Sequence, residues 1–411
     1  MDVLIERCAG LDVHRDTVVA TVRSPGPGGV RRSETRTFAT TTGQLEALAV
    51  WLVSQRVELV GMESTGVYWK PVYYVLEDHL SVWVINAEHL RNVPGRKTDV
   101  ADSLWIAQLI EHGLVAPSFV PPRPVRLLRD LTRHGRRLTE ERTRTIQRLE
   151  KVQQDAGIKL TSVASTILGK TGRAILAALL AGEEDPAVLA ELAKGRLRPK
   201  IPALREALNH RFRLEHHGLL IAQMLAHIDM LEAAITETYQ QVEVLLRPVA
   251  DRVELAMTIP GVGRRVAEVL IAEVGLDMTV FPTAGHLASW AGICPGNNSS
   301  GGKRRPGPTR HGSMWLRIAL TEAAQAAART KGTYLAAHHA QIRGRRGTQK
   351  AIGATRHDIL VAYYHIVRNR VPYHDLGPDW NDRHRSTEQQ TRRLVRQLER
   401  LGVNVTINPV A

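Results

Sequence analysis

The stretch "CAGLDVHRDTVVATVRS", residues 8–24, has the pattern of two β-strands joined by a short turn at Arg15 and Asp16. Its β-branched residues favour extended strands, and the polar pair between them favours a turn. A third strand is expected at about 31–39, because the preceding "SPGPGG" is rich in turn-forming glycine and proline. The chain is therefore predicted to begin with three consecutive strands.

Downstream of these strands the pattern alternates between helix and strand. Buried strands are expected in "VELVGMES" (57–64) and "SVWVIN" (81–86), with helices before the first, between the two, and again from about Asp99. Three strands followed by such alternation predict a mixed α/β sheet layered with helices, in a domain that covers residues 1–123.

Long helices are expected over residues 124–249. The first is rich in arginine, and the second, at about 212–246, repeats apolar residues at coiled-coil a and d positions. A small helical insertion is expected between them, at about 156–211. The a/d seam fits an intramolecular hairpin or an oligomerisation stalk, and both interpretations stay open. The arginines are Arg126, Arg129, Arg133, Arg136, Arg137, Arg142, Arg144 and Arg148, and the seam residues are Leu214, Ile221, Ile228, Ile235 and Val242.

A third region, residues 250–372, contains "IPGVG" (259–263) at the start of a helical pattern, and a charged tail follows at 373–411. The glycine turn is typical of one half of a helix-hairpin-helix, whose backbone N–H groups can hold a phosphate. A tight helix–helix turn without a ligand would have the same sequence. Arg264 and Arg265, directly after the turn, favour contact with a nucleic-acid backbone.

The composition of the 411 residues narrows the class of protein. A formal net charge of +14 and a pI of about 10.1 favour a polyanionic partner, since neutralising phosphates releases counterions. Cys8 and Cys294 make neither a disulfide framework nor a thiolate zinc site. No signal peptide and no apolar run of about eighteen residues is recognisable. We expect a soluble cytoplasmic protein without a membrane segment.

Four acidic residues of the first domain have positions suited to metal chemistry. Asp12 lies within the apolar strand "GLDVH", where a carboxylate is costly to bury without a cation or hydrogen-bond donors. Glu63 ends the strand "VGMES", and Asp99 and Asp102 in "KTDVADSLWIAQL" share one helix face. Together they can converge on one or two Mg²⁺ or Mn²⁺ ions, as phosphoryl transfer requires. Singly, Asp99 can instead cap its helix, and Glu63 can be a surface strand end.

Other polar side chains lie close to these acids in the sequence. Lys97, just before the acidic helix, can contact a phosphate or remain solvated. His14 and Arg15 can orient Asp12 or contact a DNA backbone, and a plain surface turn would explain them equally well.

The segment "PGNNSSGGKRRPGPTRHG" (295–312) places Ser299 and Ser300 between glycines. Glycines allow close backbone approach to a polymer, and the basic side chains can hold phosphates. A serine is a poor nucleophile unless a base or metal activates it, and only His311 is near in sequence. By itself the segment predicts a phosphate-binding or linker loop. Its basic residues are Lys303, Arg304, Arg305 and Arg310.

These motifs, taken in order, resemble the transposases of the bacterial insertion-sequence family numbered 110, the bridge-RNA-guided DEDD recombinases. The resemblance spans about 1–155 and 250–335, and the middle agrees only in general layout. The family's Pro-Gly-x-x-x-Ser-x-Gly-Lys pattern selects Ser300 here. The resemblance implies a ribonuclease-H/RuvC-like α/β domain, a coiled-coil region and a mainly α-helical transposase domain. The matching acidic positions are Asp12, Glu63, Asp99 and Asp102.

The resemblance also implies a mechanism. Ser300 would attack a DNA phosphodiester and form a phosphoserine link, and metal-bound acids, in the family from a neighbouring subunit, would activate it. The expected partners are donor and target DNA, a structured bridge RNA, and further copies of the chain in a dimer or a dimer of dimers on the bacterial nucleoid. The arginine-rich helix and the basic residues around the serine would contact RNA and DNA backbones.

Two other functions stay open at this point. A metal-dependent nuclease or junction resolvase would cut and release DNA, and its serine loop would only bind. A non-catalytic nucleic-acid-binding protein could descend from such an enzyme, although the intact acidic quartet argues against it.

Overall fold

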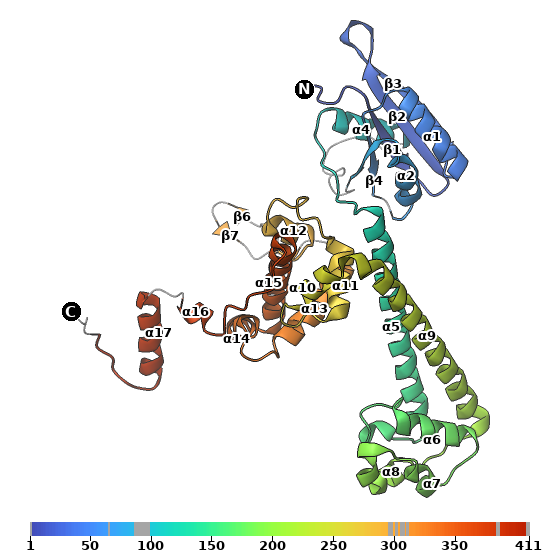
Figure 1. Cartoon of the computed structure of the whole chain (residues 1–411), viewed down its shortest axis with the longest axis vertical. Helices are drawn as coiled ribbons and strands as arrows, with labels where there is room; N and C mark the ends of the chain where they lie inside the picture. Colours follow the sequence, from blue (N-terminus) through green and yellow to red (C-terminus); the bar gives the residue numbers. More distant parts are fainter. Residues whose placement is uncertain are drawn as a thin grey trace. The chain divides into compact units, whose positions relative to one another are not determined.

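The computed structural model describes residues 2–64, 66–85, 99–294, 299–300, 303–304, 309, 312–383 and 387–407, and it divides into two compact units (Figure 1). The first unit covers Met1–Val120 and the second Pro121–Ala411. Lys97, Arg305, Arg310 and His311 lie outside the described residues.

The first unit contains a five-stranded sheet in the order β3-β2-β1-β4-β5. Strands β1, β2 and β3 form an antiparallel meander, whereas β1, β4 and β5 run parallel. The predicted mixed sheet is thus confirmed. The strands are β1 (Cys8–Val13), β2 (Thr17–Pro25), β3 (Arg31–Ala39), β4 (Leu59–Glu63) and β5 (Ser81–Ile85), and the helices are α1 (Thr42–Ser54), α2 (Trp69–Leu76) and α4 (Asp99–Glu111).

Alternate residues of β1 and β4 enter two different cores. Leu11 and Met62 point to the face covered by α1 and α2, whereas Cys8 and Leu59 pack with α4 on the other face. Glycine permits the close approach of α4 to the sheet, since a Cβ on Gly10 would lie 2.1 Å from the Ser103 carbonyl oxygen. The sheet is therefore covered by helices on both faces.

A buried carboxylate holds the carboxyl end of α4. Glu111 is fully buried and pairs with Arg23 of β2, whose Nε lies 2.7 Å from its Oε2, and with Arg31 of β3. A buried acid of this kind needs cationic partners to offset its desolvation. These pairs hold the carboxyl end of α4 against β2 and β3.

The second unit begins with two long helices that pack against each other in opposite directions, α5 (Arg123–Asp155) and α9 (Leu219–Leu246) (Figure 1). Arg142 of α5 pairs with Glu232 of α9, and a Cβ on Gly135 would lie 3.1 Å from the Tyr239 ring. The helices thus form an intramolecular hairpin, and an oligomerisation role for the seam stays a prediction.

Helix α9 lies in the segment Leu214–Met257, which is long and apolar enough to cross a membrane by length and composition. Several of its apolar residues are buried within the second unit, among them Ile221, Ile228 and Val242. Packing against other helices of this unit explains these apolar positions.

The insertion between α5 and α9 is a small helical subdomain with its own apolar core. Leu149 of α5 and Ile221 of α9 join that core, so the insertion is continuous with the ends of both long helices. Its elements are η2 (Leu160–Ser162), α6 (Lys170–Leu180), α7 (Pro186–Glu191), η3 (Gly195–Lys200), α8 (Ile201–Ala207) and the π-helical turn η4 (Leu214–Gly218).

The rest of the second unit is mainly helical (Figure 1). Tyr363 and Tyr364 are buried, and their hydroxyls donate to the carbonyls of Gly275 and Phe281. The elements are η5 (Arg247–Val249), α10 (Ala250–Met257), α11 (Arg264–Val274), α12 (Ala284–Trp290), β6 (Ser299–Ser300), β7 (Lys303–Arg304), α13 (Met314–Ala327), α14 (Tyr334–Arg346), α15 (Thr348–Asn369), α16 (Trp380–Arg383) and α17 (Thr387–Arg400).

Candidate active site

Asp12 and Glu63 belong to adjacent parallel strands at the same level of the sheet. The register pairs Leu11 with Met62, so the next residue of each strand is the acid. Side chains alternate along a strand, and Asp12 and Glu63 therefore share the face of Gly10 and Gly61, which is the face covered by α4. We call this place, defined by Asp12, Glu63 and the first turn of α4, the acidic edge.

Helix α4 runs opposite to β1, as two contacts show. The Cys8 thiol donates to the Ala107 carbonyl at 3.3 Å, and Gly10 approaches Ser103, one turn earlier in the helix. Asp12, two residues further along β1, thus lies towards the first turn of α4, which carries Asp102. The side chain of Asp102 is half-buried, and that of Asp99 lies outside the described residues.

His14 lies beside Asp12. Its Nε2 is 3.1 Å from Asp12 Oδ2, and the side chain of Asp12 is 15% exposed against 48% for His14. Arg15 contacts Asp16 instead, in an exposed pair that raises the pKa of Arg15 and lowers that of Asp16. Of the two candidates, His14 and Arg15, it is therefore His14 that orients Asp12.

The donor set of the acidic edge fits a hard divalent cation, because carboxylate oxygens are the ligands that Mg²⁺ and Mn²⁺ prefer. A different cluster, Asp155 with His216 and His217, has side-chain ligand atoms within 4.8 Å of one another. There, the Arg213 backbone N–H donates to His217 Nδ1 at 3.0 Å, so Nε2 carries the proton and donates to Asp155. His217 is thus a hydrogen-bonding residue and not a free ligand.

Ser300 lies in a short β-hairpin of the second unit. Ser299–Ser300 (β6) pairs antiparallel with Lys303–Arg304 (β7), and the register places Lys303 opposite Ser300. The side chains of these four residues lie outside the described set. Gly312, the last residue of the segment, packs against the end of α12, because a Cβ on it would lie 2.1 Å from the Ala291 carbonyl oxygen.

A buried carboxylate, Glu273 at the end of α11, holds the chain directly after the serine segment. Ser313, the amino-terminal cap of α13, donates its hydroxyl to Glu273 Oε2 at 2.8 Å. Arg133 of α5 binds the same carboxylate with two hydrogen bonds of 2.7 and 2.8 Å. Arg129 donates to the backbone carbonyls of Ala272 and Glu273. We call Glu273, Arg129, Arg133 and Ser313 the Glu273 cluster.

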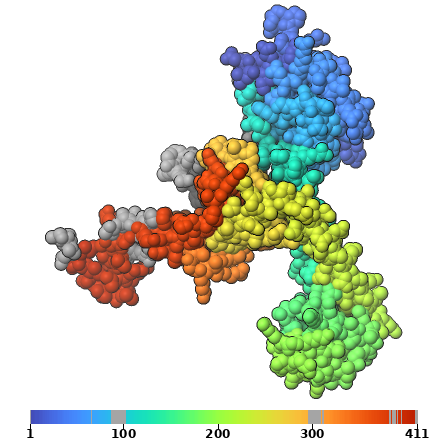
Figure 2. Space-filling view, in the orientation of Figure 1, coloured from blue at the N-terminus to red at the C-terminus, as the bar shows by residue number. Residues whose placement is uncertain are grey.

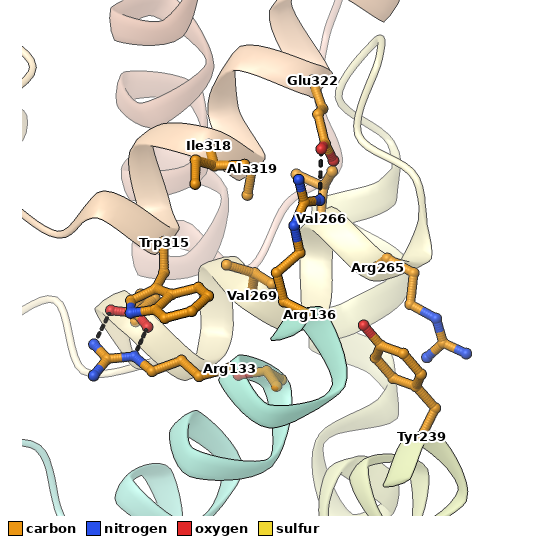
Figure 3. A pocket seen from close by; sticks show the side chains of 12 residues that line it. Arg133, Arg136, Tyr239, Arg265, Val266, Val269, Trp315, Ile318, Ala319 and Glu322 are labelled. Carbon is orange, nitrogen blue, oxygen red and sulfur yellow. Dashed lines mark hydrogen bonds and ion pairs between the residues drawn. The ribbon is translucent and has the colours of Figure 1, made fainter. Parts of the chain in front are cut away.

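A pocket opens beside this cluster, between α5, α9, α11 and α13 (Figure 3). Trp315 lies next to Arg133, whose guanidinium carbon is 5.9 Å from the ring centroid, and Arg136 donates to Glu322 at 2.6 Å. Arg265 stacks on Tyr239, with its guanidinium carbon 3.6 Å from the ring centroid. The arginines that line the pocket thus contribute mainly to packing between helices.

Many of the arginines that were predicted to contact nucleic acid form hydrogen bonds or ion pairs within the protein. Arg264 pairs with Glu243 and Glu268, and Arg265 donates to Glu268 at 2.7 Å. Contact with a nucleic-acid backbone stays a prediction for both. Along α5, the arginines with protein acceptors include Arg126, Arg129, Arg133, Arg136 and Arg142.

The sequence interpretation missed the Glu273 cluster, although one signal was present. Glu268 and Glu273 lie in the apolar run "VAEVLIAEVG" and are almost fully buried. An acid inside an apolar helix needs a cation, and the arginine-rich helix was the obvious source. The "IPGVG" turn also has a structural role, because Gly261 has φ +86° and its backbone lies against α13.

Comparison with known proteins gives family matches to two separate segments of the chain. Residues 9–156 match a model described as "Transposase", which is named for DEDD transposases of IS110, and residues 253–340 match the "Transposase IS116/IS110/IS902 family". Together these segments make up more than half of the chain.

Two curated relatives align over shorter stretches. The "Insertion element IS110 uncharacterized 43.6 kDa protein" of Streptomyces coelicolor is 33% identical over 132 residues, which is 28% of this chain and 32% of the relative. The "Probable family 20 transposase" of Pseudomonas aeruginosa is 30% identical over 113 residues, or 27% of this chain and 33% of the relative. The matches thus span about a third of the length of each relative.

Among solved structures, RuvC of Thermus thermophilus matches with 15% identity and a TM-score of 0.21, over 27% of this chain and 99% of RuvC. The same protein "in complex with Holliday junction substrate" matches with 14% identity and a TM-score of 0.22, over 28% of this chain and 99% of RuvC.

Proposed function

Because the chain belongs to the IS116/IS110/IS902 family of transposases, we propose that it cuts and rejoins DNA through a covalent link to Ser300. The observation that supports DNA strand cleavage is the acidic edge, where strand register brings Asp12 and Glu63 to one face beside the first turn of α4, and the covalent role of Ser300 follows from the family resemblance. Carboxylates gathered in this way are suited to metal-assisted phosphodiester chemistry.

In the proposed reaction the Ser300 hydroxyl forms a bond to phosphorus while the bond from phosphorus to the 3′-oxygen breaks and leaves a 3′-hydroxyl. Asp12, Glu63, Asp99 and Asp102 would hold Mg²⁺ or Mn²⁺, and the bound cation would supply positive charge to stabilise the reacting phosphate. His14 keeps Asp12 oriented through the contact at 3.1 Å. Lys303, which the hairpin register pairs with Ser300, would bind a phosphate of the DNA.

The finer features of the proposal follow from the family resemblance. A structured bridge RNA selects donor and target DNA by base pairing, and the protein binds backbones. The acids and the serine come from neighbouring copies in a dimer or a dimer of dimers. The reaction takes place on nucleoid DNA in the cytoplasm.

The test uses purified protein with Mg²⁺, the RNA encoded beside its gene, and labelled donor and target DNA. We expect a protein–DNA adduct that survives denaturation in the wild type and is lost in Ser300→Ala. Ser299→Ala is the matched control, since it removes the neighbouring hydroxyl and should keep the adduct. Asp12→Asn and Asp102→Asn should abolish the adduct while RNA binding persists.

A metal-dependent nuclease without covalent serine chemistry is the second candidate function. The acidic edge favours it, since metal-bound carboxylates suffice for hydrolysis without a serine. Normal cleavage by Ser300→Ala, with no adduct trapped in the wild type, would establish this second function and exclude the first.

A further inference from the structure

The turn between α14 and α15 carries a group of exposed basic side chains. Gly347 alone separates the two helices, with φ +83° and open space where a Cβ would be. Arg343, Arg345, Arg346 and Lys350 are all exposed around it. None of these four forms an ion pair within the described part of the chain. We call them the basic turn; Figure 2 draws the part of the chain that contains α14 and α15 in orange to red.

The neighbouring acid does not neutralise the basic turn. The α14–α15 hairpin, residues 334–369, contains one carboxylate, Asp358. Its Oδ2 lies 2.7 Å from His338 Nδ1, and its other oxygen faces His357. Although burial alone would raise the pKa of Asp358, these two histidines lower it overall. Asp358 is therefore occupied within the hairpin, and the charge of the turn remains uncompensated.

Helix dipoles explain only part of this pattern. Arginines in the last turn of α14 complement the negative end of that helix. Lys350, however, lies in the first turn of α15, where a cation is unfavourable and no acidic residue is present. Four like charges around one glycine repel one another, so they destabilise the isolated protein. An anionic partner would remove this repulsion.

We propose that the basic turn binds the phosphate backbone of duplex DNA. Residues 341–353 contain no aromatic side chain on which an unpaired base could stack, which favours a duplex over single-stranded RNA. Gly344 and Gly347 have open space around them and let a backbone approach closely. The site rests on the proposed function in one respect, namely that DNA is the nucleic acid on which the protein acts.

The test measures the affinity of the full chain for a random-sequence duplex of about 30 base pairs, by fluorescence anisotropy between 50 and 200 mM salt. The triple variant Arg343→Gln, Arg345→Gln, Arg346→Gln should bind on the order of tenfold or more weakly. The slope of log affinity against log salt should fall by about 2 to 3, since each phosphate contact contributes about 0.9.

The matched control removes the same charge elsewhere. Arg196, Arg198 and Arg205 lie exposed in the insertion and have no ion pair among the described residues. Their triple glutamine variant should keep both the affinity and the slope. Equal losses in the two variants, or none in either, would overturn the site. A loss confined to a structured RNA stem-loop would overturn the choice of DNA.

The experiments distinguish a failure of the basic-turn proposal from a failure of the proposed function. Ser300→Ala should bind duplex DNA with an unchanged salt slope, because it removes no charge. The basic-turn variant should still form the serine adduct once DNA is saturating. If it binds normally while Ser300→Ala loses the adduct, the basic turn is wrong and the recombinase mechanism stands. If the wild type binds no duplex DNA, both the basic-turn proposal and the recombinase mechanism are wrong.

Discussion

The acidic edge and the start of α13 depend mainly on two different kinds of contact, although an ion pair also holds the far end of α4 and Gly312 also packs against a backbone. At the acidic edge the positions follow from backbone register and from the close approach of α4 at Gly10. The serine segment is held where it enters α13 by side chains, through the carboxylate of Glu273 and its arginine partners. Backbone packing tolerates no added atom, whereas an ion-pair cluster tolerates no lost charge. Each region should therefore fail under a different substitution.

The largest effect is expected for Glu273→Ala, which breaks the side-chain support. The carboxylate is 1% exposed, and its loss leaves Arg133 and Ser313 without their shared acceptor. Removing one partner of a buried pair costs about 3 to 5 kcal/mol of the free energy of unfolding. Hydrogen exchange, measured peptide by peptide, should show faster exchange in α11 and in the first turn of α13.

Glu322→Ala is the matched control, because Glu322 is 50% exposed and also pairs with an arginine of α5. An exposed pair contributes less than about 1 kcal/mol. If the two alanine variants exchange at the same rates, the Glu273 cluster does not hold the serine segment. Ser313→Ala, which removes one hydrogen bond and a helix cap, should fall between them.

The second effect, somewhat smaller, is expected for Gly10→Ala at the acidic edge. A Cβ here would lie 2.1 Å from the Ser103 carbonyl oxygen and 2.4 Å from the Ala107 nitrogen, so α4 has to move away from β1. Overpacking of this kind costs about 3 kcal/mol. Exchange should accelerate in β1 and α4 while the second unit stays protected.

Gly43→Ala provides the comparison within the same unit. No atom lies within 4 Å of the Cβ position of Gly43, which is in the first turn of α1. Alanine should therefore be neutral or stabilise by up to about 1 kcal/mol. Unchanged protection of α4 in Gly10→Ala would show that the acidic edge does not depend on this close contact.

The same two regions show which features can be predicted from the sequence. The strands of the first unit were predictable because β-branched residues and turn signals are local, and Asp12 and Glu63 stood out as acids in apolar strands. Their shared face depends on β1 pairing in parallel with β4, which local patterns do not specify.

The arginines of α5 show where prediction from the sequence fails. Charge alone suggested a nucleic-acid surface, yet Arg133 meets Glu273, which lies 140 residues further along the chain. No local pattern connects these positions. The number of arginines in a helix is thus a weaker guide to nucleic-acid binding than the presence of carboxylates that can pair with them.

The smallest expected effect concerns the pH dependence of stability. It tests the packing of α4 on the sheet without adding an atom, and so it sharpens the comparison. Cys8 is buried beside α4, and burial, together with the nearby Glu111 carboxylate, raises the pKa of its thiol to about 12. An unfolded thiol titrates at about 8.5. The folded pKa is the higher one, so the stabilisation is complete below about pH 8.5 and decreases as the pH rises towards 12.

At pH 10 we expect a loss of about 1 to 2 kcal/mol, seen as faster exchange in β1 and α4. Cys8→Ala should lack this alkaline loss. Iodoacetamide at pH 9 should modify the half-buried Cys294 well before Cys8, because the reactive thiolate of Cys8 is scarcely populated in the folded unit. Equal modification of the two cysteines, or the same alkaline loss in Cys8→Ala, would mean that α4 does not seal this face of the sheet.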